Sequence, residues 1–91
     1  MIKIDSINSE KDLRSYLSFM IKMTGLGFHP DDPIDGYVDN YGHCLFLSDE
    51  VPVLERLKKE SFDYCSANNM DVYEVSMEVA KEQFGDFFGG F

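Results

Sequence analysis

Hydrophobic residues recur at helical spacing in three parts of the chain, and each part begins with a recognisable cap signal. The first part, residues 10–24, is apolar on one face and becomes apolar nearly all round in its second half. Ser9 offers a side-chain oxygen to the free amides of a helix start, and Asp12 completes a pattern similar to a capping box. Gly25 is a natural stop, because glycine enters the left-handed cap conformation without steric cost. The pattern predicts a helix over residues 10–24 that supplies the centre of the core.

A second helix is predicted over the next long stretch with helical spacing. Ser48 or Asp49 caps its start, and Pro52 is acceptable there because the first-turn amides have no partner inside the helix. Leucines recur on one face of this stretch, and charged residues occupy the opposite face. Asn68 ends the helix, since asparagine tolerates the left-handed conformation better than most residues. We expect this helix to continue to Ala67.

The third helix has the clearest start signal in the chain. Asp71 offers a cap, and Glu74 stands three residues later, as in a capping box. Met70 and Val75 occupy the positions of a hydrophobic staple, which fixes the angle at which the chain enters a helix. Valines then recur at helical spacing. Together these signals predict a helix from Val72 to Phe84.

The segment between the first two helices has no sustained helical or alternating pattern. An Asp-Pro pair beginning at Asp32 is typical of a helix start, so we expect a short helical turn over residues 33–38 with this aspartate as its cap. Residues 39–42 are typical of a turn. Residues 43–47 are typical of an extended segment, and they can pair with the alternating residues 2–4.

Length and composition limit how these elements are arranged. The chain has 91 residues, the size of one domain with a modest core. It is 44% hydrophobic and 14% aromatic, which is too apolar for a disordered protein. We therefore predict a single compact domain over residues 1–91 that is mainly α. It contains three helices and a short helical turn, with at most a minimal two-stranded pairing of residues 2–4 with residues 43–47.

The charge of the chain is strongly negative and unevenly distributed. The formal net charge is −9. Residues 25–50 contain six acids and no Lys or Arg, so this segment alone carries −6. Phosphate backbones and anionic lipid surfaces repel such a chain, which disfavours direct binding to nucleic acid or membranes. The sequence has neither a secretory signal pattern nor an apolar run long enough to span a membrane, so we expect a cytoplasmic protein.

Two cysteines, Cys44 and Cys65, stand 21 positions apart, and neither belongs to a CxxC motif. This spacing indicates neither a disulfide framework nor a structural zinc site, so we expect reduced, partly buried thiols. His43 precedes Cys44, and a nearby imidazolium lowers the pKa of a thiol. Adjacent residues of an extended segment point to opposite faces, however, which works against a catalytic pair.

Acids and histidines of the central segment raise the alternative of a small metal-binding protein or metal-dependent enzyme. Carboxylates and imidazoles are the donors that divalent metals take. The EF-hand template, started at Asp31, fails at its third position, which is Pro33, and at its twelfth, which is Gly42. The alternative metal site consists of His29, Asp31, Asp35 and His43.

A protein-binding surface is the preferred hypothesis. Aromatic residues carry much of the energy at protein interfaces, and several stand near the acids or in the C-terminal tail. We expect a non-enzymatic regulatory module without a cofactor, which binds an unidentified protein and can form a homodimer. A variant of this hypothesis is an acidic mimic of nucleic acid that inhibits a basic partner. The predicted binding residues are Asp31, Asp32, Asp35, Tyr37, Asp39, Tyr41, Phe87, Phe88 and Phe91.

The segments TGLGFHPDDPIDGYV and DVYEVSMEVA resemble small bacterial or phage-type proteins of uncharacterised function. The resemblance covers residues 24–38 and 65–80. It implies no activity, and no catalytic residue is carried over from it. It implies instead that GLGFHPD is a recurring structural unit.

Overall fold

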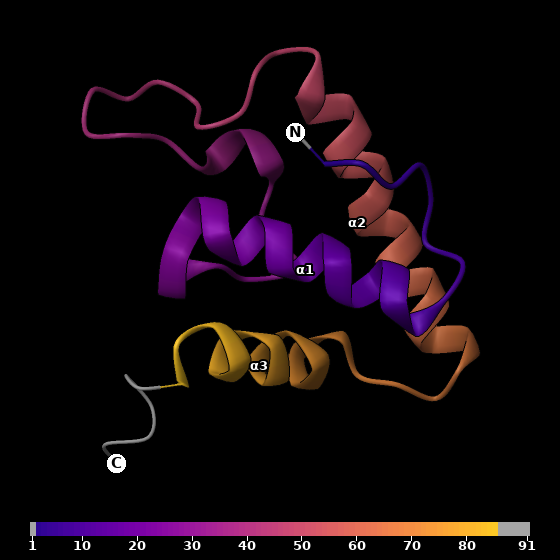
Figure 1. Ribbon diagram of the computed structural model, residues 1–91. Coiled ribbons are helices and arrows are strands. Elements are labelled where there is room, and N and C mark those ends of the chain that lie inside the picture. Colours follow the sequence, from indigo (N-terminus) through magenta and orange to yellow (C-terminus); the bar gives the residue numbers. More distant parts are fainter. Residues whose placement is uncertain (1, 86–91) are drawn as a thin grey trace.

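The computed structural model describes residues 2–85, and helices dominate this part of the chain, as predicted. The α-helices are α1 (Glu10–Thr24), α2 (Glu50–Ala67) and α3 (Val72–Gln83). Helix α1 lies across the middle of the molecule, α2 passes it at a steep angle, and α3 runs beside α1 in the same direction (Figure 1). The bounds of α1 are those predicted, and α3 ends one residue earlier than predicted.

The ends of α1 follow the sequence signals closely. Ser9 is extended, and its hydroxyl accepts a hydrogen bond of 3.1 Å from the N–H of Asp12. The Asp12 carboxylate reaches back and accepts 3.1 Å from the N–H of Asn8. At the other end, Gly25 has a φ of 81°, and its N–H donates to the carbonyl of Ile21. A short 3₁₀ turn, η1 (Gly25–Gly27), then leads the chain away.

Two aspartates at helix N-caps behave differently. Asp71 is extended, and its carboxylate accepts 2.9 Å from the N–H of Tyr73, so it caps α3 as predicted. For α2 the sequence predicted Ser48 or Asp49 as the cap. Asp49 occupies the N-cap position, but it has helical backbone angles and its side chain makes no capping bond. Glu50 supplies a bond instead, since its carboxylate accepts 3.0 Å from the N–H of Leu47.

The predicted helical turn after Asp32 exists as one 3₁₀ turn, η2 (Ile34–Gly36), but its cap was assigned to the wrong residue. Pro33 takes the N-cap position, and the first free N–H of the turn belongs to Ile34. That N–H donates 2.7 Å to the carboxylate of Glu55 on α2. Asp32 instead accepts 3.0 Å from the hydroxyl of Tyr37. Glu55, 21 positions along the chain, therefore accepts the hydrogen bond that the sequence predicted for Asp32.

The extended pairing also has a different partner from the one predicted. Residues 43–47 do not pair with residues 2–4, because the bridge that forms is antiparallel and joins Val38 to Cys44. The turn at residues 39–42 brings these two together, as its position in the sequence predicted. Closing a short loop costs less entropy than pairing two segments about forty residues apart, so Cys44 pairs with the nearby Val38. The result is a small projecting hairpin (Figure 1).

One hydrophobic core joins all three helices to the segments between them. Ile7, Phe28, Ile34 and Phe46 enter it from outside the helices. Helix α1 supplies its centre, with side chains that are at most 2% exposed. The helical members are Leu13, Tyr16, Leu17, Met20 and Ile21 from α1, Leu54, Leu57 and Cys65 from α2, and Val72, Val75 and Val79 from α3.

Candidate protein-binding surface

The hairpin and the segment between it and α2 present large apolar side chains to solvent, and exposed aspartates occur in the same part of the chain. Tyr41 is 85% exposed, Leu47 68% and Val38 50%. Asp35 and Asp39 are also exposed. Together we call these five residues the turn surface. Burying apolar side chains is favourable, so large apolar side chains left this exposed are candidates for contact with a partner.

Hydrogen bonds within the turn hold Tyr41 outward. The Asp39 carboxylate accepts 2.8 Å from the N–H of Tyr41 and 3.0 Å from the N–H of His43. Gly42 has a φ of 80°, which side chains disfavour, and its N–H donates 3.1 Å to the carbonyl of Asp39. The ring of His43 lies beside that of Tyr41, with 6.5 Å between centroids. These hydrogen bonds order the backbone of the turn that carries Tyr41, so the backbone does not have to be ordered on binding.

Two predicted binding residues, Asp32 and Tyr37, make contacts within the chain that support the segment around them. The Tyr37 hydroxyl accepts 3.0 Å from the N–H of His29 and donates to the Asp32 carboxylate. Its ring stacks on Phe28 at a centroid distance of 6.1 Å. Burial, together with the carboxylates of Asp32 and Asp31, raises the pKa of Tyr37 to about 12. These contacts close the segment between η1 and η2 into one ordered unit.

Asp31, another predicted binding residue, is exposed and directly precedes Asp32 in the segment between η1 and η2. Phe87, Phe88 and Phe91 lie outside the described residues.

The alternative metal site is not assembled. Among residues 2–85, no three His, Cys, Asp or Glu side chains lie close enough together to hold a metal ion. His43 lies near one carboxylate, that of Asp39, with 4.0 Å between Nδ1 and Oδ2. The predicted set of His29, Asp31, Asp35 and His43 therefore forms no three-ligand group in this part of the chain.

The two cysteines are free thiols in different environments. Cys65 is buried in the core, and this burial raises the pKa of its thiol, which makes the thiolate scarcer. Cys44 is exposed on the hairpin. The prediction of partly buried thiols is therefore correct for Cys65 and wrong for Cys44, because the hairpin projects away from the core.

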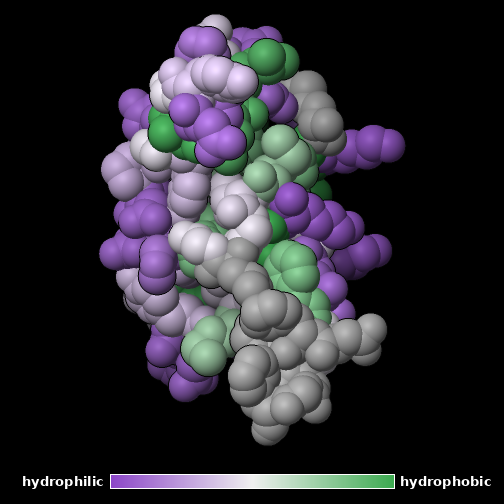
Figure 2. All heavy atoms as spheres, turned by 90° about the vertical axis from the view of Figure 1, so that its left-hand side faces the viewer, coloured by the Kyte–Doolittle hydropathy of each residue, from purple (hydrophilic) through white to green (hydrophobic). Residues whose placement is uncertain are grey.

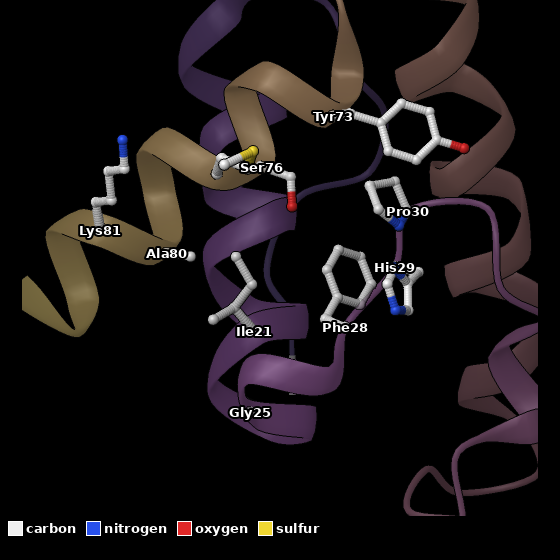
Figure 3. Close-up of a pocket in the computed structure, with 10 residues that line it drawn as sticks. Ile21, Gly25, Phe28, His29, Pro30, Tyr73, Ser76, Ala80 and Lys81 are labelled. Carbon is white, nitrogen blue, oxygen red and sulfur yellow. The ribbon is translucent and has the colours of Figure 1, made fainter. Parts of the chain in front are cut away.

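A second surface, which sequence reasoning missed, is an apolar groove of about 410 Å³ beside α3. Ile21 of α1 and Gly25 of η1 lie at one side of it, Phe28 to Pro30 form another wall, and α3 closes it (Figure 3). Tyr73 and Met77 widen the hydrophobic stripe of α3 beyond the face that packs on the core. This extra width was the feature of the sequence that could have predicted the groove. We call this feature the α3 groove.

The left-hand side of the molecule in Figure 1 carries the tip of the hairpin. Figure 2 shows this side, where hydrophobic residues lie between hydrophilic ones from top to bottom of the view. The hairpin and the ends of α1 and α3 that face left in Figure 1 lie on this side. No protein-family model, curated protein or solved structure matches the chain. In the described part of the chain, no helix is both long and apolar enough to cross a membrane.

Proposed function

We propose that this chain is a non-enzymatic regulatory module that binds a basic protein through the turn surface. The observation that supports this most strongly is Tyr41, which is 85% exposed on a turn ordered by its own hydrogen bonds. Tyrosine combines a large apolar ring with a polar tip and is among the residues that dominate binding energy at interfaces. Val38, on the same hairpin, and Leu47, just before α2, add further exposed apolar side chains.

The charge of the turn surface defines the partner. Asp35 and Asp39 are exposed, and residues 25–50 contain no Lys or Arg to neutralise them. Complementary charge guides the approach of partners and suppresses wrong ones, so the fitting partner carries Lys or Arg around a small apolar patch. Nucleic acids and anionic membranes are repelled by the same field.

Site-specific photocrosslinking in native lysate tests this function. Benzoylphenylalanine replaces Tyr41 in the full chain, and in a control chain it replaces Lys59 on α2, whose side chain is 80% exposed. We expect a discrete protein adduct from position 41 that position 59 does not give. The same adducts from both positions, or none from position 41, would contradict the proposal.

A charge-matched pair of variants tests the role of the acids. Asp35→Asn combined with Asp39→Asn removes two charges from the turn surface, and asparagine keeps the side-chain oxygen that holds the turn. Asp5→Asn combined with Asp63→Asn removes two exposed charges elsewhere. We expect only the first pair to reduce the yield of the position-41 adduct. Equal reduction by both pairs would show that only the overall charge matters.

A further inference from the structure

The segment that leads into the hairpin is held on α2 through its main chain. The carboxylate of Glu55 accepts 2.7 Å from the N–H of Ile34, and Nζ of Lys58 donates 3.3 Å to the carbonyl of Asp32. A salt bridge of 3.1 Å joins Glu55 to Lys58, three positions apart on α2. These two side chains therefore bind the main-chain groups on both sides of Pro33, which has no N–H of its own to donate.

The bonds to α2 form in a partly shielded place. The side chain of Ile34 is fully buried, and that of Lys58 is 20% exposed. The bond from the N–H of Ile34 goes to a charged acceptor, and such bonds are stronger than those between neutral groups. Removing the Glu55 carboxylate would take this acceptor away from a main-chain donor beside a buried side chain. The pair therefore fixes η2 on α2.

Hydrogen bonds and packing continue from the docked segment to the hairpin. The Asp32 carboxylate accepts 3.0 Å from the hydroxyl of Tyr37, and the carbonyl of Tyr37 accepts 2.9 Å from the N–H of Leu45 on the other arm. Phe46 follows and is 4% exposed, with its ring 6.3 Å from that of Phe19 on α1. The loop of the hairpin projects beyond the helices (Figure 1). The hairpin is thus held at its base.

We propose that Glu55 and Lys58 are positioning residues of the turn surface, which fix the direction in which the hairpin presents Tyr41 to the partner. This inference rests on the proposed function and adds to it two residues that stand outside the turn surface. Binding is weaker when a segment must first be ordered. A hairpin released from α2 should therefore bind less well, although every residue of the turn surface is still present.

Two spin labels measure the position of the hairpin directly. The exposed thiol of Cys44 carries one label on the hairpin, and Ser15→Cys provides an exposed site for the second on α1. Cys65 is buried in the core, and mass spectrometry confirms that two labels are attached. Double electron–electron resonance on the full chain then gives the distribution of distances between them. We expect one narrow distribution, and a broad one would contradict a fixed hairpin.

A charge-matched pair of substitutions on α2 locates the cause. Glu55→Ala should widen the distance distribution about twofold or more, because the segment then opens locally. Asp63→Ala removes the same charge from α2, where the carboxylate pairs with the exposed side chain of Lys59, and should leave the width unchanged. Circular dichroism confirms that the helices are retained. A contribution to overall stability alone would not widen the distribution of the folded chain, so equal widths in the two variants would overturn the proposal.

Two further variants separate the bonds that the pair makes. Glu55→Gln keeps a side-chain oxygen that can accept from the N–H of Ile34, so it should restore a narrow distribution. Lys58→Met removes the bond to the Asp32 carbonyl but keeps an apolar side chain of similar length, and it should widen the distribution. An unchanged width in Lys58→Met would overturn the role of this lysine.

The crosslinking measurement connects position to binding. With benzoylphenylalanine at position 41, Glu55→Ala should reduce the yield of the protein adduct several-fold, and Asp63→Ala should not. Equal yields from these two variants would overturn the positioning role. No adduct from the original chain would instead contradict the proposed function, and the spin-label comparison would still decide whether Glu55 and Lys58 fix the hairpin.

Discussion

At the scale of single residues, the hydroxyl of Tyr16 lowers the stability of the core. Its side chain is buried, and its hydroxyl has no hydrogen-bond partner in the described part of the chain. Burial raises the pKa of this hydroxyl well above its ordinary value. A buried polar group without a partner costs about 1–3 kcal/mol. Removing the hydroxyl therefore removes a cost and leaves the ring packing intact.

Tyr16→Phe should raise the free energy of unfolding by about 1 kcal/mol, and the melting temperature by several degrees for a domain of this size. Urea unfolding and calorimetry both measure this change. Tyr41→Phe makes the same chemical change at an exposed position and should have no effect. A loss of stability in Tyr16→Phe would show that its hydroxyl has a bonding partner in solution.

Glu60 connects the N-terminal segment to α2. Its carboxylate accepts 2.9 Å from the N–H of Ile7 and pairs with Arg56 at 2.7 Å. The bond from Ile7 is the main cause that lowers the pKa of Glu60 below 4.5, its value in an unfolded chain. A carboxylate with a lowered pKa stabilises the fold above its unfolded pKa, and this stabilisation disappears as pH falls through the folded pKa.

Glu60→Gln should therefore lower the free energy of unfolding at pH 7 by about 1 kcal/mol or less, since the ion pair is partly exposed. The difference from the original chain should shrink as the pH falls below about 4.5, and it should be small near pH 2.5. Urea unfolding at several pH values measures it. A difference that stays constant across this range would show that the charge of Glu60 contributes nothing.

At the scale of elements, the two N-cap aspartates offer a matched comparison. Asp71→Ala removes the bond to the N–H of Tyr73 and should destabilise the protein by about 1 kcal/mol. Asp49→Ala removes no capping bond, so its effect should stay within about 0.5 kcal/mol. Denaturant unfolding measures both. An equal loss in the two variants would contradict the different cap geometries.

At the scale of the whole molecule, the net charge is −9, and residues 25–50 carry −6 of it. The proposed association with a basic protein should therefore depend on salt. Raising the ionic strength from about 50 mM to about 300 mM shortens the distance over which opposite charges attract each other. The yield of the position-41 adduct should therefore decrease several-fold. The variant carrying Asp35→Asn and Asp39→Asn should show a weaker salt dependence. Adduct yields that do not respond to salt would exclude a basic partner.

The sequence by itself determined those structural features whose hydrogen bonds join residues close together in the chain. The extent of α1, the cap of α3 by Asp71 and the turn at residues 39–42 were all predicted correctly. Each depends on hydrogen bonds between groups only a few residues apart, which the order of residue types encodes directly.

Only the tertiary structure decided which distant groups meet. Glu55 satisfies the N–H of Ile34 across 21 positions, which left Asp32 free to bind Tyr37. The α3 groove likewise combines α1, the segment after it and α3, so no single stretch of sequence displays it. Such contacts depend on how the helices pack. Helix packing is a property of the whole core, so the spacing of residue types within one segment does not predict it.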